Sequence, residues 1–211
     1  MPIELKTFVV GPLQNNCYLL LDPENNIAAM IDPPLAVETI FPQLKQAGIT
    51  ITHILITHAH FDHIGGVQPV LETYPVKPQI YMHQDELAVW QQKGSAANFG
   101  IDFPLPEKPD QLFSGEPTLQ LGAIALQTRF TPGHTSGHCT FYLPEMQSAF
   151  CGDVIFHHSI GRTDLPGGNF ATLEKSIREK IYTLPPDTTL YPGHGEFTTV
   201  VEEQRNNPFI N

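Results

Sequence analysis

Three histidines and an aspartate lie within six residues of this chain, in the segment His58-Ala59-His60-Phe61-Asp62-His63. They directly follow an apolar run at residues 51–56, which predicts a buried strand, and imidazole and carboxylate groups together are typical of a metal site. A surface cluster of histidines is the alternative. Side chains at positions i and i+2 lie about 200° apart on a helix but on one side of an extended chain, so His58, His60 and Asp62 can converge only in a strand-like or loop conformation. His63 then points elsewhere. One loop could therefore serve two metal ions, with His58 and His60 on one and Asp62 and His63 on the other.

Three more candidate ligands occupy glycine-flanked turns that each follow a predicted strand. They are His134 in the segment Thr-Pro-Gly-His-Thr, Asp153 in Cys-Gly-Asp and His194 in Pro-Gly-His-Gly. Glycine allows close approach of the backbone in such turns. With the first loop, these turns supply five histidines and two aspartates, which suit Zn²⁺, Fe²⁺ or Mn²⁺, and the lack of cysteine ligands argues against a structural zinc site. Three protein ligands per ion and one shared carboxylate would leave positions open for water, which indicates catalysis.

The elements that must position these ligands form two similar halves. Short apolar runs predict strands at residues 7–10, 17–21, 27–31, 51–56 and 79–82, and at 118–121, 124–130, 139–143, 148–151 and 188–191. Helical spacing predicts helices at residues 37–47, 66–74, 85–92, 171–183 and 199–205. Residues 93–117 are irregular, and this loop either covers a pocket or is a surface excursion. Two runs of strands joined to helices predict an α+β fold with two sheets face to face, in one domain spanning residues 1–211.

Composition excludes several classes of protein. The chain of 211 residues has 11 basic and 22 acidic side chains and a net charge of −11, which argues against nucleic acid as a partner. No apolar run approaches 18 residues and no secretory signal is visible, so we expect a cytoplasmic protein without a membrane partner. Cys17, Cys139 and Cys151 have no CxxC spacing and are expected to be reduced and packed as small apolar residues. The sequence makes no prediction of the oligomeric state.

Taken together, these motifs resemble the metallo-β-lactamase superfamily and, within it, the short single-domain bacterial members of the glyoxalase II (hydroxyacylglutathione hydrolase) group. The resemblance spans nearly the whole chain and includes two further segments, Asn15-Asn16-Cys17-Tyr18-Leu19 and Gly161-Arg162-Thr163-Asp164-Leu165-Pro166-Gly167-Gly168. It implies a four-layer αββα sandwich with two mixed sheets and helices outside, without the helical C-terminal glutathione-binding domain of the long members. It also implies two divalent ions, one bound by His58, His60 and His134 and the other by Asp62, His63 and His194, with Asp153 bridging them.

The activity that the resemblance implies is hydrolysis of a glutathione thioester, from S-D-lactoylglutathione to D-lactate and glutathione, in methylglyoxal detoxification. The two ions would be Zn and/or Fe, with Mn as a further possibility, and the partner would be this small-molecule substrate. Metal ions lower the pKa of bound water from about 15.7 toward 7, so a bridging hydroxide would attack the thioester carbonyl while the metals stabilise the oxyanion. Asp62 could also orient this hydroxide.

Several alternatives remain open at this point. A persulfide dioxygenase is the nearest one, because that related group resembles the same pattern but uses a single iron, bound by the equivalents of His58, His134 and Asp153. A β-lactamase is disfavoured because no export signal is visible, and a nuclease is disfavoured by the charge. A non-enzymatic metal-binding module is the alternative of another class. Arg162 is a candidate contact for a substrate carboxylate, or else a structural residue of its loop. His138, four residues beyond His134, is expected to support a ligand rather than to bind metal.

Overall fold

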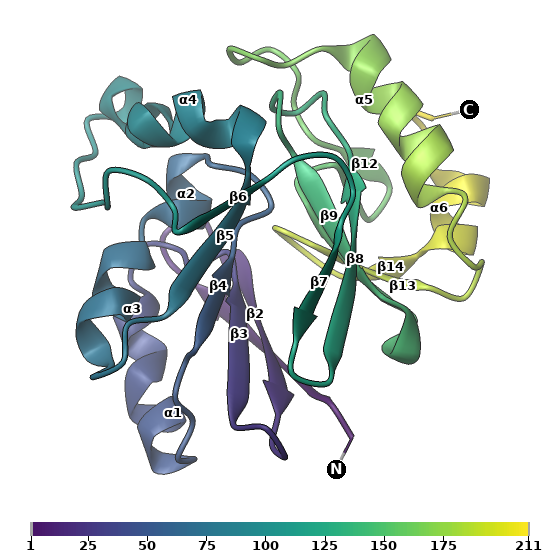
Figure 1. Ribbon diagram of the computed structural model, residues 1–211. Coiled ribbons are helices and arrows are strands. Elements are labelled where there is room, and N and C mark those ends of the chain that lie inside the picture. The colour runs from purple at the N-terminus through teal and green to yellow at the C-terminus, as the bar shows by residue number, and fades with distance from the viewer. Residues whose placement is uncertain (1, 211) are drawn as a thin grey trace.

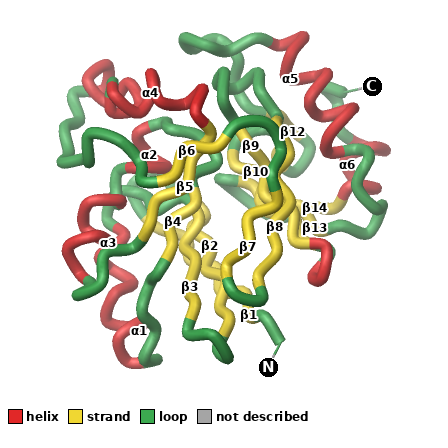
Figure 2. Tube along the Cα trace, in the orientation of Figure 1, coloured by secondary structure: helices red, strands yellow, loops and turns green. Residues whose placement is uncertain are grey.

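Two six-stranded β-sheets pack face to face, and helices cover the outer side of each, so the fold is a four-layer αββα sandwich (Figure 1). The structure is a computed structural model that describes residues 2–210. Helices α1, α3 and α4 lie outside the first sheet, and α5 and α6 lie outside the second, with the strands between them (Figure 2). This arrangement confirms the predicted fold class. Within residues 2–210, no helix is long and apolar enough to cross a membrane.

The first sheet is built by the N-terminal half of the chain in the order β1-β2-β3-β4-β5-β6. Its strands are β1 (Glu4–Val10), β2 (Asn15–Asp22), β3 (Ile27–Ile31), β4 (His53–Leu55), β5 (Gln79–His83) and β6 (Gln111–Phe113). Strands β1 to β3 pair antiparallel, and β3 to β6 pair parallel. Parallel pairing requires crossover connections. These contain α1 (Phe41–Gln46), α2 (Phe61–Ile64), α3 (Val67–Thr73) and α4 (Leu87–Gln91), with the 3₁₀ turns η1 (Val37–Ile40), η2 (Gln84–Glu86) and η3 (Lys93–Phe99).

The second sheet is built by the C-terminal half in the order β14-β13-β10-β9-β8-β7. Its strands are β7 (Thr118–Leu121), β8 (Ile124–Phe130), β9 (Cys139–Leu143), β10 (Ser148–Gly152), β13 (Thr189–Pro192) and β14 (Thr198–Thr199). All neighbours pair antiparallel except β10 and β13, which are parallel. The other elements are the 3₁₀ turn η4 (Pro144–Met146), the hairpin of β11 (Ile155–Phe156) and β12 (Ser159–Ile160), α5 (Phe170–Ser176), the π-helical turn η5 (Ile177–Ile181) and α6 (Val200–Asn206).

Strand β2 shows how the layers are held together. All eight of its residues are buried, and their side chains alternate between two cores because successive side chains of a strand point to opposite faces. Leu19 and Leu21 pack with the helices outside the first sheet, whereas Tyr18 and Leu20 pack between the two sheets. Burial of one such side chain contributes about 1.5–3 kcal/mol. The near-continuous apolar run of this strand therefore stabilises three layers at once.

Several predicted elements differ from the observed ones. The strand expected at residues 51–56 is limited to β4, and the helix expected at 37–47 is divided into η1 and α1. Pro42 lies in the first turn of α1, where the N–H that proline lacks would have no partner within the helix. The helix expected at residues 171–183 is α5 continued by the π-helical turn η5. Residues 93–117 are more regular than expected, because they contain η3 and the edge strand β6.

One end of the sandwich collects the loops that carry the predicted ligands. Strands β8, β10 and β13 run in the same direction, so the loops with His134, Asp153 and His194 leave the second sheet at one end. The loop after β4 reaches the same end, where the Cys139 backbone N–H donates to the Thr57 carbonyl at 2.9 Å. Loops at the carboxyl ends of strands are the usual place for ligands in mixed α/β folds.

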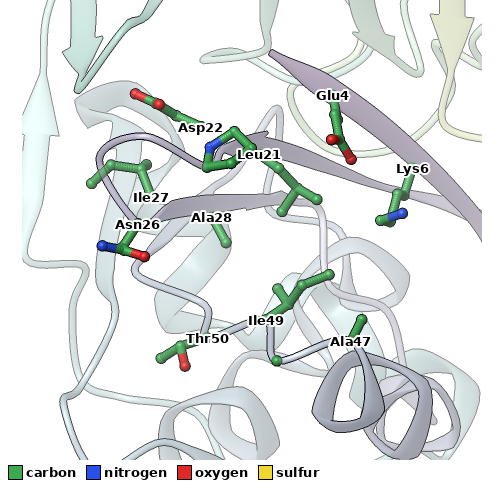
Figure 3. Close-up of a pocket in the computed structure, with 12 residues that line it drawn as sticks. Glu4, Lys6, Leu21, Asp22, Asn26, Ile27, Ala28, Ala47, Ile49 and Thr50 are labelled. Atoms are coloured by element: carbon green, nitrogen blue, oxygen red, sulfur yellow. The ribbon is translucent and has the colours of Figure 1, made fainter. Parts of the chain in front are cut away.

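The opposite end is closed by contacts between turns. The backbone N–H of Ala123, in the β7–β8 turn, donates to Oδ2 of Asp22 at 2.6 Å, and Asp22 directly precedes the β2–β3 turn. Both of these turns lie toward the bottom of Figure 1. Beside the β2–β3 turn is a hollow of about 360 Å³, drawn in Figure 3. Its described lining residues come from β1 to β3 and from residues 47–50, and they include no histidine or cysteine. This hollow is therefore separate from the predicted ligands.

Candidate metal centre

The first histidine segment changes conformation half-way along. The backbone is extended at His60, with φ −65° and ψ 149°, and α2 begins at the next residue. His58 and His60 therefore precede the helix, whereas Asp62 and His63 lie within it. The strand-like or loop conformation that convergence of His58, His60 and Asp62 would require is therefore absent at Asp62, which lies in the helix. The helix directs Asp62 to His194, whose Nε2 lies 3.2 Å from Asp62 Oδ2.

His58, His60 and His134 form one group of possible ligands, called cluster 1, whose nitrogen atoms lie within 4.8 Å of one another. Nε2 of His134 is 2.9 Å from Nδ1 of His60. Nδ1 of His134 donates to the carbonyl of Arg162 at 2.8 Å, so its Nε2 carries the lone pair and faces the cluster. The Thr57 hydroxyl donates to Asp32, so Nδ1 of His58 donates to that hydroxyl and leaves Nε2 of His58 unprotonated.

The three imidazoles of cluster 1 are neutral at ordinary pH. Burial, together with the neighbouring His134, lowers the pKa of His60 to about 3. Burial also lowers the pKa of His134 to about 4 and holds that of His58 well below its usual range. Because metal ions bind the unprotonated nitrogen, this cluster presents lone pairs without first losing protons.

Asp62, His63 and His194 form a second group within the same distance limit, called cluster 2. Nδ1 of His63 donates to Oδ2 of Asp32 at 3.1 Å, and Nδ1 of His194 donates to the carbonyl of Leu13 at 3.1 Å. Both Nε2 atoms therefore face Asp62. Burial alone would lower the pKa of His63, but the carboxylates of Asp62, Asp153 and Asp32 raise it to about 10. Burial opposes the charge of Asp62, but nearby His63 and His194 and the Asn15 amide hold its pKa far below the usual range.

Asp153 lies between the two clusters. Its Oδ1 is 3.5 Å from Nε2 of His63, and its Oδ2 is 3.7 Å from Nε2 of both His134 and His194. The backbone N–H of Asp153 donates to Nε2 of His138, which is fully buried, so His138 supports a candidate ligand as expected. Burial raises the pKa of Asp153 against the opposing charge of His63. Asp153 is placed to contact ions in both clusters.

Two unsatisfied buried acceptors in the donor set indicate that it is suited to metal ions. Nε2 of His58 and Oδ1 of Asp153 are buried acceptors without a hydrogen-bond partner among the described residues. An unsatisfied buried acceptor costs about 1–3 kcal/mol, and more if it is charged, unless a cation satisfies it. Imidazole and carboxylate donors, with no thiolate, suit Zn²⁺, Fe²⁺ or Mn²⁺. The two clusters thus fit two divalent ions.

Two buried carboxylates that the sequence analysis missed hold the ligand loops. Glu86 accepts hydrogen bonds from the Ala59 backbone N–H, the Thr135 hydroxyl and the Gly137 backbone N–H, and so joins the first histidine segment to the turn of His134. Asp32 accepts from the Thr57 backbone N–H, the Thr57 hydroxyl and His63. Asp32 follows an apolar strand, as Asp153 does, and that signal could have identified it. No sequence signal distinguishes Glu86.

The predicted ligands open into a cavity of about 780 Å³. His60, Asp62, His134, Asp153 and His194 line it, together with Arg162, whereas His58 and His63 have no exposed surface. Gly193 packs on the same group, because a Cβ there would lie 2.2 Å from Oδ1 of Asp153.

Away from the two clusters, a group that contains two histidines has a structural role. His157, His158 and Glu203 bring possible ligand atoms together near the β11–β12 turn. The Glu203 carboxylate already accepts hydrogen bonds from the His158 backbone N–H, the Thr198 hydroxyl and the Asn207 amide. It therefore fastens this turn to α6.

A model of a known protein family, described as the metallo-beta-lactamase superfamily, matches residues 10–194. The chain belongs to the metallo-beta-lactamase superfamily. This member is 42% identical over 206 residues to a probable metallo-hydrolase of Bacillus subtilis, YqgX, covering 96% of this chain and 95% of that protein. It is 34% identical over 210 residues to the hydroxyacylglutathione hydrolase GloC of Haemophilus influenzae, covering 99% of each.

Two crystal structures resemble this superfamily member over nearly its whole length. BLEG-1, described as a B3 metallo-beta-lactamase, has a TM-score of 0.91 and 36% identity, with 99% of this chain and 100% of that chain covered. TTHA1623 in a di-iron-bound form has a TM-score of 0.84 and 36% identity, with 97% and 99% covered.

Proposed function

We propose that the chain is a metal-dependent hydrolase that cleaves a glutathione thioester, with S-D-lactoylglutathione giving D-lactate and glutathione as the lead reaction. The observation that carries the proposal is the pair of three-donor clusters linked by Asp153 at the base of one cavity. The similarity to the Haemophilus influenzae protein named as a hydroxyacylglutathione hydrolase supports the substrate. YqgX, described only as a probable metallo-hydrolase, supports the broader class of reaction.

In this proposal, cluster 1 and cluster 2 would each hold one divalent ion, and the two clusters would share Asp153. Zinc and iron suit the donors, and the di-iron form of TTHA1623 supports iron as one occupant. When bound, the ions supply a hydroxide nucleophile at neutral pH and positive charge for the oxyanion.

The residues around the clusters fix the orientation of the donors. Backbone carbonyls of Arg162 and Leu13 accept from Nδ1 of His134 and His194, and the Asp32 carboxylate accepts from Nδ1 of His63. Each contact directs the opposite ring nitrogen into the site, as metal-binding histidines require. The Asn15 amide donates to Oδ2 of Asp62, which would leave the other oxygen of this carboxylate to accept a hydrogen bond from the attacking group and so orient it.

The cysteines of the chain are not nucleophiles in this mechanism. Cys17, Cys139 and Cys151 are free and buried, which confirms that they pack as small apolar residues. Burial raises the pKa of all three thiols, so thiolate is scarce near neutral pH.

A thioester panel led by S-D-lactoylglutathione tests the proposal, with thiol release and bound metal measured on the same sample. We expect turnover that a chelator abolishes and that added Zn²⁺ or Fe²⁺ restores. A β-lactam belongs in the panel, because BLEG-1 is described as a B3 metallo-beta-lactamase. A fully metallated sample that hydrolyses no thioester would overturn the proposal.

A mononuclear-iron persulfide dioxygenase is the second candidate. The three donors that this activity would use, His58, His134 and Asp153, are also close together, with Asp153 Oδ2 3.7 Å from Nε2 of His134. The complete donor set of cluster 2 favours two ions instead. One iron per chain and oxygen uptake with glutathione persulfide would establish this alternative and exclude the hydrolase.

A further inference from the structure

The cavity above the clusters has an apolar wall around a polar base. We give the name apolar wall to Leu13, Phe99, Ile101, Phe156 and Leu165, which line the cavity together with the candidate ligands. They come from four separate segments of the chain: the β1–β2 turn, the end of η3 and the residues after it, β11, and the loop before α5. Because these residues come from four segments, they come together only in the folded protein.

The part of the wall formed by Phe99 and Ile101 is held in place by a close backbone contact. Gly94 has a φ of 61°, and a Cβ at this position would lie 2.1 Å from the backbone nitrogen of Phe61. The segment therefore packs directly on the first histidine segment. The Phe99 ring lies on that of Phe61, with centroids 5.1 Å apart. Of residues 93–117, the first part covers the pocket, because Gly94, Ser95, Phe99 and Ile101 line the cavity.

Two residues of the wall are large and apolar but lie largely exposed to solvent. Leu13 and Phe99 are 50% and 53% exposed, and both line the cavity. Apolar surface at the mouth of a concave site gains free energy when an apolar group of a ligand covers it.

Within residues 2–210, and apart from the proposed metal ions, the cavity offers an anionic ligand no unpaired Lys or Arg side chain. Arg162 is the one Lys or Arg among the described residues that line it, and its guanidinium makes two hydrogen bonds, at 2.7 and 2.8 Å, to Asp164. Lys93, which adjoins the lining residue Gly94, is likewise paired with Asp102. The two carboxylates of a glutathione group would find no unpaired basic side chain on this wall.

We propose that the site selects thioesters by an apolar acyl group, aromatic or branched aliphatic and larger than lactoyl, and that charged groups of the thiol half contribute little to recognition. This inference rests on the thioester hydrolase proposed above. The acyl group lies against the apolar wall, and the reacting carbonyl lies over the clusters at its base.

A matched pair of substrates tests the acyl preference. S-D-mandeloylglutathione replaces the methyl group of S-D-lactoylglutathione by a phenyl ring and keeps the thiol and the α-hydroxyl. We expect kcat/KM for the mandeloyl compound to be higher by about tenfold or more, because an apolar pocket discriminates by at least this factor for a group of that size. A mandeloyl to lactoyl ratio at or below one would overturn the preference.

Variants of the wall show whether these residues cause the preference. Phe99→Ala should lower the mandeloyl to lactoyl ratio of kcat/KM about fivefold or more. Phe99→Leu should restore most of the loss. Phe209→Ala is the matched control, because Phe209 is 51% exposed and is not part of the cavity lining. Equal losses for both substrates, or an unchanged ratio, would contradict the role of the wall.

The thiol half is tested by exchanging glutathione for N-acetylcysteamine in the mandeloyl thioester. Because the nearby cations are paired, we expect kcat/KM to change by less than about threefold, the range of weak exposed ion pairs. A loss of tenfold or more would show that the charges of glutathione are read. If no thioester reacts in a metallated sample, the proposed function fails. If thioesters react without acyl preference, only the present inference fails.

Discussion

Cluster 1 and cluster 2 are built from similar residues but differ in charge. Burial lowers the pKa of the cluster 1 imidazoles, to about 3 for His60 and about 4 for His134, whereas carboxylates raise that of His63 to about 10. The first cluster is therefore neutral without metal, and the second is an ion pair of a protonated imidazole and Asp62. Metal binding at cluster 2 must displace a proton that cluster 1 does not carry.

The difference teaches that desolvation and neighbouring charge can give adjacent histidines opposite properties. His58 and His63 are ring neighbours, with centroids 4.1 Å apart, yet their pKa values move in opposite directions. Only His63 lies beside carboxylates on both of its nitrogens. We expect the two sites to differ in affinity and in their response to pH.

The largest effect is expected for the residue that the clusters share. Asp153→Asn keeps the size of the side chain but removes the charge that faces His63, His134 and His194. We expect turnover to fall by about 100-fold or more, because loss of groups that merely support metal ligands already costs 10–100-fold. Rates and metal content per chain are to be measured together. A variant that keeps two ions and most of its activity would show that the clusters work separately.

A smaller effect is expected from the two buried carboxylates. Glu86 serves cluster 1, whereas Asp32 contacts His63 of cluster 2 directly and reaches His58 of cluster 1 through the Thr57 hydroxyl. Glu86→Gln places an amide among three donors around cluster 1, and Asp32→Asn places an NH₂ group against Nδ1 of His63 in cluster 2. Asp32 has a φ of 51°, which asparagine tolerates, so its backbone need not change.

We expect Glu86→Gln to lose about 10–100-fold in affinity for the cluster 1 ion and to keep the affinity for the other, and Asp32→Asn to lose affinity for both ions, most strongly at cluster 2. Chelator competition that resolves the two binding steps is the measurement, and each variant is the control for the other. Equal weakening of both steps by Glu86→Gln would contradict its assignment to cluster 1 alone.

The candidate ligands that the structure brings together could be selected from sequence, because each lies directly after an apolar strand or in a glycine-flanked turn. The fold class followed from two runs of strands joined to helices. Glu86 could not be predicted, because its three donors lie 27, 49 and 51 residues away and only the packed fold brings them together. The short helix α2 was missed because four residues carry too little periodicity to distinguish a helical turn from a loop. The apolar wall could not be predicted either, because its residues come from four segments that only the packed fold brings together.

The charge difference also predicts a pH dependence for the chelated protein. Lowered pKa values in cluster 1 mean that unfolding takes up protons below pH 6.5, so stability falls as the pH drops from 6.5 toward 4. The raised pKa of His63 has the opposite sign: its stabilisation is complete below pH 6.5 and is lost as the pH rises through 10.

Thermal unfolding of the chelated protein at different pH values tests this expectation. A loss of 1 kcal/mol lowers Tm by roughly 2–4 °C in a chain of this size, so a maximum near pH 6.5 with falls of several degrees on both sides should be visible. His63→Gln should reduce the fall between pH 6.5 and about 8, before unfolded thiols and phenols titrate, and keep the acid fall. Part of the alkaline fall should remain, because Asp62 and Asp153 raise the pKa of His194 against the effect of burial. An alkaline fall in His63→Gln as large as that of the wild type would show that His63 does not cause it.

The smallest effect is expected at Arg162, where backbone and side chain have separate tasks. Its carbonyl accepts the hydrogen bond that orients His134 in cluster 1, and its exposed guanidinium is paired with Asp164. Arg162→Ala removes the side chain and keeps the carbonyl, so we expect metal affinity within about twofold of the wild type, as for other exposed ion pairs. In cluster 2 the corresponding support for His63 is the Asp32 side chain, which a substitution does remove. Chelator competition on Arg162→Ala and Asp32→Asn therefore compares a ligand held by the backbone with one held by a side chain. A large loss of affinity in Arg162→Ala would show that its ion pair, and not the carbonyl alone, keeps His134 in place.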